Sequence, residues 1–106
     1  MNSEIINIYN VCKHIADNKH STEVNDLIVE ELSELIKAVM KLERFYMYDE
    51  SLRCNYDEIY DNIYEELADV IIMICQFIHK NKISHQNLLD EISKKIIRYY
   101  ETISDK

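Results

Sequence analysis

The sequence predicts an all-α fold, a single domain of four helices over residues 1–106. The 106 residues include no glycine and no proline, so the tight Asn-Gly or Asp-Gly turns that join strands in all-β folds are missing. Apolar residues make up 47% of the chain, which is enough to form a core. Apolar side chains also recur at helical spacing in four separate segments.

The first two helices are expected on either side of a short connection. The first extends from about Glu4 to Asp17, where isoleucines and a cysteine recur three and four residues apart. The second follows Ser21 and Thr22, which are typical N-cap residues, and continues to about Phe45.

The last two helices flank a second connection. The third is expected from about Asp57 to Lys80, and Asn81 is expected to end it because asparagine tolerates the left-handed conformation. The fourth follows Ser84, another candidate N-cap. Its apolar positions are Leu88, Leu89, Ile92, Ile96, Tyr99 and Ile103.

The third helix is unusually apolar. Between Val70 and Ile78 only Gln76 is strongly polar, so apolar side chains point nearly all round the helix, as in a helix that is buried on most sides. Four helices of this size seldom surround one of their number. We therefore expect a homodimer or homotetramer with this helix at the subunit contact; the alternative is a well-covered central helix in a monomer.

Charge and cysteine content indicate where the protein resides and which classes of partner it is not expected to bind. The formal charge of −8 disfavours nucleic acids and anionic membranes. We expect no secretion signal, because Met1 to Glu4 lack a basic start and a following apolar run. Cys12, Cys54 and Cys75 form no CxxC pair, which fits reduced thiols in the cytoplasm. Without glycine the chain also has no phosphate-binding loop of the P-loop or GxGxxG kind.

Two pairs of carboxylates lie in unusual positions on the predicted helices. At about 100° per residue, Glu31 falls inside the apolar arc of the second helix, and Glu34 falls at its edge. The third helix repeats the arrangement, with Glu66 inside the apolar arc and Asp69 at its rim. Other ExxD pairs lie at a helix start or on a polar side.

Such an arrangement is unfavourable without a partner. Burying an unpaired carboxylate costs several kcal/mol, of order ~5, and inward carboxylates on neighbouring helices repel each other. Oxygen ligands without Cys or His nearby are typical of Mg²⁺ or Mn²⁺ rather than zinc. A di-iron bundle needs Glu-x-x-His, which the chain lacks. The alternative is that these acids form salt bridges at the edge of the core.

The same residues resemble a known family. Residues 30–35 (EELSEL) and 66–70 (ELADV) are similar to the EExxE…ExxD signature of the all-α nucleoside triphosphate pyrophosphohydrolases, and of their MazG-like branch in particular. The resemblance extends from about Val24 to Arg98. It implies a four-helix MazG-like bundle, which we expect to be completed by homo-oligomerisation.

The resemblance also implies an activity and a set of site residues. It implies Mg²⁺-dependent attack between the α and β phosphates of a nucleotide substrate, giving a monophosphate and pyrophosphate. A carboxylate not fully used as a ligand takes the proton, and Glu30 and Glu34 are the nearest candidates. The implied metal ligands are Glu31, Glu34, Glu66 and Asp69.

The predicted fourth helix supplies the implied basic residues. Lys95 and Arg98 match the family's late basic segment and are candidates to contact the outer phosphates; the alternative is an ordinary basic helix face. Two other functions stay open, a noncatalytic helical assembly module and a pyrophosphohydrolase of a phosphoribosyl nucleotide.

The stretch between the two acidic motifs is longer than is usual in the family. Its surplus falls around Phe45 to Asp61 and is rich in tyrosine. The aromatic rings either form a lid that stacks on a base or pack against one another at the edge of the core. The tyrosines in question are Tyr46, Tyr48, Tyr56 and Tyr60.

Overall fold

The computed structural model describes residues 3–47 and 56–104 and consists of four α-helices. No strand occurs in these two ranges, so the all-α prediction is confirmed. Each helix begins and ends within about two residues of its expected bounds, which is the usual uncertainty of a helix end. The helices are α1 (Ser3–Asp17), α2 (Ser21–Met47), α3 (Tyr56–Lys80) and α4 (His85–Ser104).

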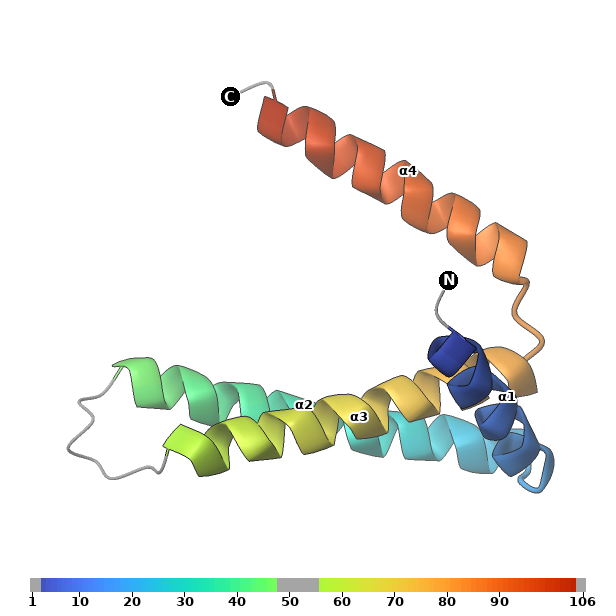
Figure 1. Cartoon of the computed structure of the whole chain (residues 1–106), viewed down its shortest axis with the longest axis horizontal. Helices are drawn as coiled ribbons and strands as arrows, with labels where there is room; N and C mark the ends of the chain where they lie inside the picture. The colour runs from blue at the N-terminus through green and yellow to red at the C-terminus, as the bar shows by residue number, and fades with distance from the viewer. Residues whose placement is uncertain (1–2, 48–55, 105–106) are drawn as a thin grey trace.

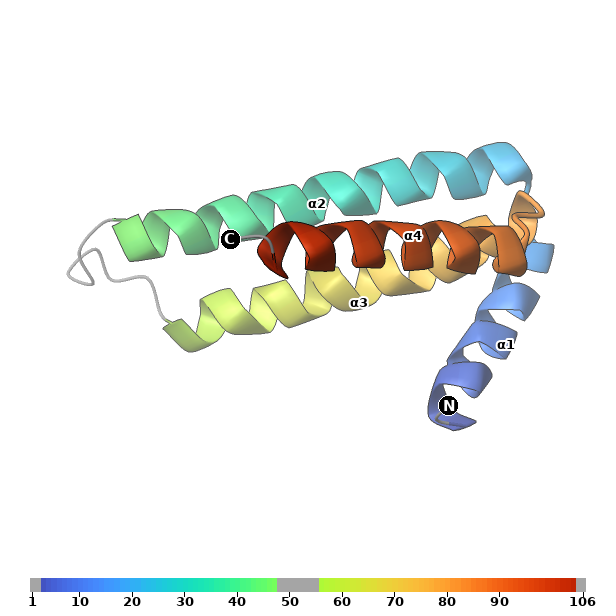
Figure 2. The same cartoon turned by 90° about the horizontal axis from the view of Figure 1, so that it is seen from above.

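The helices form a hairpin with two appendages. Helices α2 and α3 lie antiparallel and in contact, and α1 crosses α3 near one end of the hairpin (Figure 1). Helix α4 leaves that same end. It overlies the hairpin in the view of Figure 2, but Figure 1 shows that it stands well apart from α2 and α3.

The core lies where α3 meets α1 and α2. Ala16 and Val24 are fully buried and Ala38 is nearly so, and small side chains at a helix contact allow the two backbones to approach closely. Where the structure describes side-chain burial, the buried apolar residues come from α1, α2 and α3. They are Cys12, Ala16, Val24, Ala38, Ile59, Val70 and Met73.

The connection between α1 and α2 is two residues shorter than expected. Helix α2 already begins at Ser21, and the carbonyl of His20 accepts the first helical hydrogen bond, from the Val24 N–H at 3.1 Å. The predicted cap at Ser21 and Thr22 is therefore wrong by one position. Next to this helix start, the Lys19 ammonium group donates a hydrogen bond to the Gln76 side chain of α3 at 3.0 Å.

The connection between α3 and α4 is a Schellman turn. The Lys82 N–H donates to the His79 carbonyl and the Ile83 N–H to the Ile78 carbonyl, the pair of bonds that defines this helix ending. The left-handed residue is Lys82, with φ 55°, and not Asn81 as predicted. The predicted cap at Ser84 is confirmed, since its hydroxyl oxygen accepts the backbone N–H of Asn87 at 3.2 Å.

Aromatic rings close the opposite end of the hairpin. Tyr56 lies 5.8 Å from Phe45 and 4.6 Å from Tyr60, measured between ring centroids, and the hydroxyls of Tyr46 and Tyr60 are hydrogen-bonded to each other. The described rings therefore pack against one another, which is the second of the two arrangements expected from the sequence. Tyr48 lies outside the described residues.

The described cysteines are reduced, and the described helices are unsuited to crossing a membrane. Cys12 and Cys75 are free thiols, and burial together with the neighbouring Cys75 raises the pKa of the Cys12 thiol. Cys54 lies outside the described residues. Within the described part of the chain, no helix combines the length and the apolarity that crossing a membrane requires.

Within residues 3–47 and 56–104, no helix covers α4. Each of its residues is exposed, including Ile96, Tyr100 and Ile103 at 61%, 71% and 70%. Helix α3 is likewise incompletely covered, because Ile71 and Ile74 on its apolar stretch are more than two-fifths exposed. The expectation that α3 is buried on most sides therefore does not hold within one chain.

A buried polar contact ties the α1–α2 connection to α3 and gives the first prediction. Gln76 is 2% exposed, and its side-chain oxygen accepts the Lys19 ammonium. Replacing Lys19 by Met leaves this oxygen buried without that donor, which costs about 1–3 kcal/mol of unfolding free energy. Urea unfolding followed by circular dichroism measures the loss.

The matched control removes both partners. The double variant Lys19→Met/Gln76→Leu has no buried oxygen to satisfy, so we expect it to recover most of the lost stability. If the double variant is less stable than Lys19→Met alone, the contact does not have the role assigned to it.

Candidate metal centre

The middle of the α2–α3 hairpin brings together the predicted acidic residues. One carboxylate oxygen each from Glu31, Glu66 and Asp69 lies within 4.8 Å of the other two, and all three residues are half-buried. An ion that binds oxygen at 2.0–2.6 Å separates its ligand atoms by at most ~5 Å. The spacing of the three oxygens therefore fits a single divalent cation.

Electrostatic repulsion within this acidic cluster is visible at Glu31. Partial burial raises the pKa of the Glu31 carboxyl above its usual value, and the negative charges of Asp69, Glu66 and Glu30 raise it further. A hydrogen bond with Asp69 acts in the same direction, because only the protonated form of a carboxyl can donate. The cluster thus holds protons more tightly than isolated carboxylates do.

Glu66 is perturbed in the same way from the other helix. Partial burial raises the pKa of its carboxyl, and the charges of Asp69, Glu34 and Glu65 add to the effect. The charge of Glu34 therefore reaches across from α2 to α3. A divalent cation reverses this effect, because it favours the ionised form of every carboxylate beside it.

Glu34 and Glu30 lie beside the cluster but are not among the three residues whose oxygens lie within 4.8 Å of one another. The Glu34 carboxylate accepts a hydrogen bond from the Lys37 ammonium at 3.2 Å, and its side chain is 45% exposed. Glu30 is exposed, and its carbonyl accepts the Ser33 hydroxyl at 3.3 Å. Glu34 is thus placed beside Glu66, whereas the charge of Glu30 acts on its chain neighbour Glu31.

The predicted basic residues are not brought to the cluster. Lys95 and Arg98 are exposed residues of α4, and α4 stands apart from α2 and α3 (Figure 1). A single chain therefore presents the acidic half of the candidate site without the basic half.

The contact between Asp17 and His79 was not predicted from the sequence. His79 accepts or donates a hydrogen bond with Asp17 at 2.7 Å, and this bond lowers the pKa of the Asp17 carboxyl. The two residues are 62 positions apart in the chain. No local pattern connects them, because only the crossing of α1 over α3 brings them together.

Sequence comparison relates the chain to a known protein family. The family model of the MazG nucleotide pyrophosphohydrolase domain matches residues 19–103. The chain belongs to this family. The MazG match includes all of α2 and α3, and with them every member of the acidic cluster. Neither the curated proteins nor the solved structures contain a match to the chain.

The donor set fits the metal dependence of the MazG family, whose members generally require a divalent cation. The cluster offers only carboxylate oxygens, which are hard ligands suited to Mg²⁺ or Mn²⁺. The raised pKa values of Glu31 and Glu66 are those of carboxylates that lack a nearby positive charge. A bound cation supplies that charge.

The raised pKa values predict how the metal-free protein responds to pH. A carboxyl whose pKa is higher in the folded than in the unfolded chain destabilises the fold above the raised pKa, and this penalty disappears as the pH falls to the unfolded value of 4.5. In EDTA at pH 7.5 we therefore expect Glu31→Gln to raise the melting temperature by a few degrees. The gain should shrink as the pH approaches 4.5.

The control for this prediction is Glu23→Gln, which removes the same charge from the first turn of α2. A carboxylate there interacts favourably with the helix N-terminus, so this variant should show no gain. Mg²⁺ should raise the melting temperature of the wild type far more than that of Glu31→Gln. A Glu31→Gln variant that melts below the wild type in EDTA would contradict the repulsion described here.

Proposed function

We propose that this MazG-family chain hydrolyses a nucleoside triphosphate, a deoxynucleotide or modified nucleotide included, to the monophosphate and pyrophosphate in the presence of Mg²⁺. The observation that carries the proposal is the convergence of Glu31, Glu66 and Asp69 oxygens within 4.8 Å. Mn²⁺ is the alternative ion, since it accepts the same ligands.

The roles of the acidic residues follow from their positions. Glu31, Glu66 and Asp69 hold the cation, and Glu34 completes the ligand set or acts beside it. When bound, the cation neutralises phosphate charge and lowers the pKa of a coordinated water molecule. The residue that accepts the proton from this water must lie near the cluster and keep a free oxygen.

Glu34 and Glu30 are the candidates for that proton acceptor. Glu34 is the better placed, because its charge acts on Glu66 across the helix contact and its carboxylate is partly exposed to solvent. Its hydrogen bond with Lys37 orients the carboxylate and leaves its second oxygen to accept a proton.

In this proposal, assembly with a second copy of the chain brings basic residues of α4 to the nucleotide. The chain exposes 8476 Å², whereas a compact monomer of its mass exposes about 6,200 Å². Its radius of gyration is 17.5 Å, against about 13 Å for a compact domain of this length. The excess surface of two chains is on the scale of an obligate homodimer interface.

We therefore propose that the apolar face of α4 packs on another copy as part of a homodimer or homotetramer. In that assembly Lys95 and Arg98 contact the outer phosphates of the nucleotide, Arg98 as a two-pronged donor and Lys95 as a point charge. The charges of these two residues oppose those of the acidic cluster, which favours their approach.

The exposed apolar surface also favours a second candidate function. A helical assembly module that has lost the reaction would present the same large apolar faces. A third candidate keeps the acidic cluster but acts on a phosphoribosyl nucleotide instead of a triphosphate. Substrate panels distinguish all three, because the assembly module turns over none of the compounds.

The catalytic proposal predicts a loss of turnover without loss of the fold. Glu31→Gln and Glu66→Gln each replace a charged carboxylate ligand by a neutral amide. Residues that only hydrogen-bond to metal ligands already contribute 10–100-fold, so we expect at least about a 100-fold fall in kcat/KM. Pyrophosphate release from a panel of nucleoside triphosphates, with Mg²⁺ and with EDTA, measures it. Circular dichroism checks that both variants remain helical.

Glu23→Gln serves as the control, since it removes one carboxylate from α2 outside the cluster. It should retain turnover within about two-fold. The enzyme proposal is wrong if the wild-type protein releases no pyrophosphate from any nucleotide tested, with either Mg²⁺ or Mn²⁺. The assembly module is then the remaining candidate function.

The assembly proposal predicts the mass of the protein in solution. Light scattering after size exclusion should give two or four times the chain mass of 12.7 kDa. Ile96→Glu places a charge on the exposed apolar face of α4 and should reduce the assembled fraction. Lys94→Glu introduces the same side chain roughly on the opposite face, about 160° away around the helix, and should leave the mass unchanged.

A further inference from the structure

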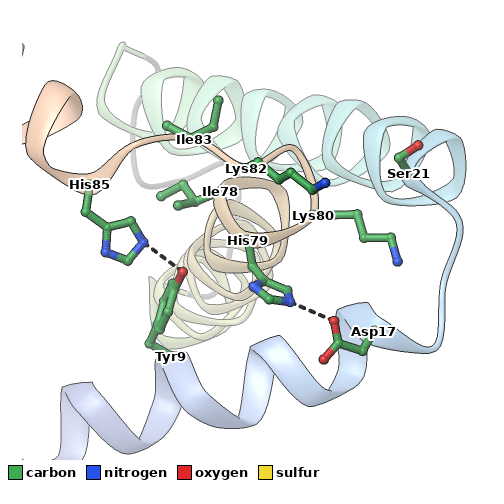
Figure 3. Close-up of a pocket in the computed structure, with 9 residues that line it drawn as sticks. All are labelled: Tyr9, Asp17, Ser21, Ile78, His79, Lys80, Lys82, Ile83 and His85. Carbon is green, nitrogen blue, oxygen red and sulfur yellow. Dashed lines mark hydrogen bonds and ion pairs between the residues drawn. The ribbon is translucent and has the colours of Figure 1, made fainter.

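A pocket of about 610 Å³ lies at the end of the hairpin where all four helices begin or end (Figure 3). Its volume is within the range of small-molecule sites. Along α3 it lies about 15 Å from the acidic cluster, counted over the ten residues from Asp69 to His79. The residues that line it are Tyr9, Asp17, Ser21, Ile78, His79, Lys80, Lys82, Ile83 and His85.

The pocket carries the opposite charge to the rest of the chain. Lys80 and Lys82 contribute two ammonium groups, and Asp17 is the one carboxylate among the lining residues. The pocket is therefore net positive even when both of its imidazoles are neutral, in a chain whose formal charge is −8. A concave positive region on an acidic protein attracts small anions selectively.

The lone carboxylate is already engaged. An Asp17 oxygen lies 2.7 Å from the His79 Nε2, and the charges of His79 and Lys80 stabilise its ionised form. Figure 3 shows the Lys80 side chain extending toward Asp17 and the imidazole of His79 held against it. Asp17 thus engages His79, and the two ammonium groups of Lys80 and Lys82 outnumber its single negative charge.

The turn between α3 and α4 fixes the backbone at Lys82, which lines the pocket. Lys82 adopts the left-handed conformation, which is unfavourable for a residue with a side chain, and the two hydrogen bonds of the Schellman turn hold it there. His85 is fixed separately, because its Nε2 lies 2.8 Å from the Tyr9 hydroxyl and its ring meets the Tyr9 ring edge to face.

Two helix N-termini add to the positive potential. Ser21 begins α2 and His85 begins α4, and both residues line the pocket. Helix N-termini carry partial positive charge and backbone N–H groups that bind phosphate. The C-termini of α1 and α3 also meet the pocket, but carbonyls in both last turns, such as those of Ala16 and His79, already accept backbone N–H groups.

We propose that this pocket binds a phosphate-bearing small molecule at a site separate from the acidic cluster. Several donors around one concavity, on Lys80, Lys82 and the two helix N-termini, are suited to a multiply charged oxyanion. The walls formed by Ile78, Ile83 and the Tyr9 ring accept an apolar or aromatic part of the same ligand. Binding here does not require a divalent cation.

The experiment is calorimetric titration of the full-length protein in EDTA with inorganic phosphate, pyrophosphate and AMP in separate arms. EDTA keeps cations from bridging the anion to the acidic cluster. We expect saturable binding of at least one of the three. Tighter binding of AMP than of phosphate assigns the site to a nucleotide, whereas equal binding assigns it to the phosphate group alone; both outcomes support the site.

The variants separate this pocket from general charge effects. Lys80→Gln/Lys82→Asn removes both ammonium groups while keeping a residue that tolerates the left-handed turn, and affinity should fall about ten-fold. Lys41→Gln/Lys94→Gln removes the same charge elsewhere and should change affinity less than two-fold. Asp17→Asn removes the opposing carboxylate and should tighten binding.

Amide chemical shifts locate the anion directly. Shifts should concentrate at Ser21 and at residues 80–85. The proposal is overturned if none of the three anions binds, if the two double variants weaken binding equally, or if the shifts concentrate at Glu31 and Glu66. Circular dichroism confirms that each variant is folded, and Asp17→Asn provides a gain of affinity that misfolding cannot imitate.

Discussion

The repulsion between carboxylates on neighbouring helices is the constraint on which this structure depends. Glu31 on α2 and Glu66 on α3 each face a like charge across the helix contact, and partial burial makes that repulsion stronger than it is in water. The packing of α2 on α3 must therefore offset an unfavourable interaction at its centre. A divalent cation between these carboxylates would replace the repulsion with attraction, which is the basis of the proposed metal site.

The rest of the fold keeps these two helices in register. Small and medium side chains at Ala38, Ile59 and Val70 pack α2 against α3, and aromatic rings close one end of the hairpin. At the other end α1 crosses α3, and Lys19 is anchored to the buried Gln76. Rigid packing at both ends limits how far the acidic side chains can move apart.

Charge is segregated along the hairpin. The acidic cluster occupies its middle, and the positive pocket occupies the end where α3 passes into α4. Helix α4 leaves from that pocket with its apolar side chains exposed. A molecule bound in the pocket would contact α1 through Tyr9 and α4 through His85, at the base of the helix whose apolar face is proposed to pack on a second copy.

The sequence by itself determined the helices, because periodicity and caps such as Ser84 are local properties. It also identified Glu31, Glu66 and Asp69, since their positions on a helical wheel follow from spacing alone. Only the tertiary structure decided which distant residues meet, as with Asp17 and His79 or Lys19 and Gln76. Tertiary structure also separated Lys95 and Arg98 from the cluster, because the direction in which α4 leaves its turn depends on the geometry at Lys82 and on contacts that no periodic pattern encodes.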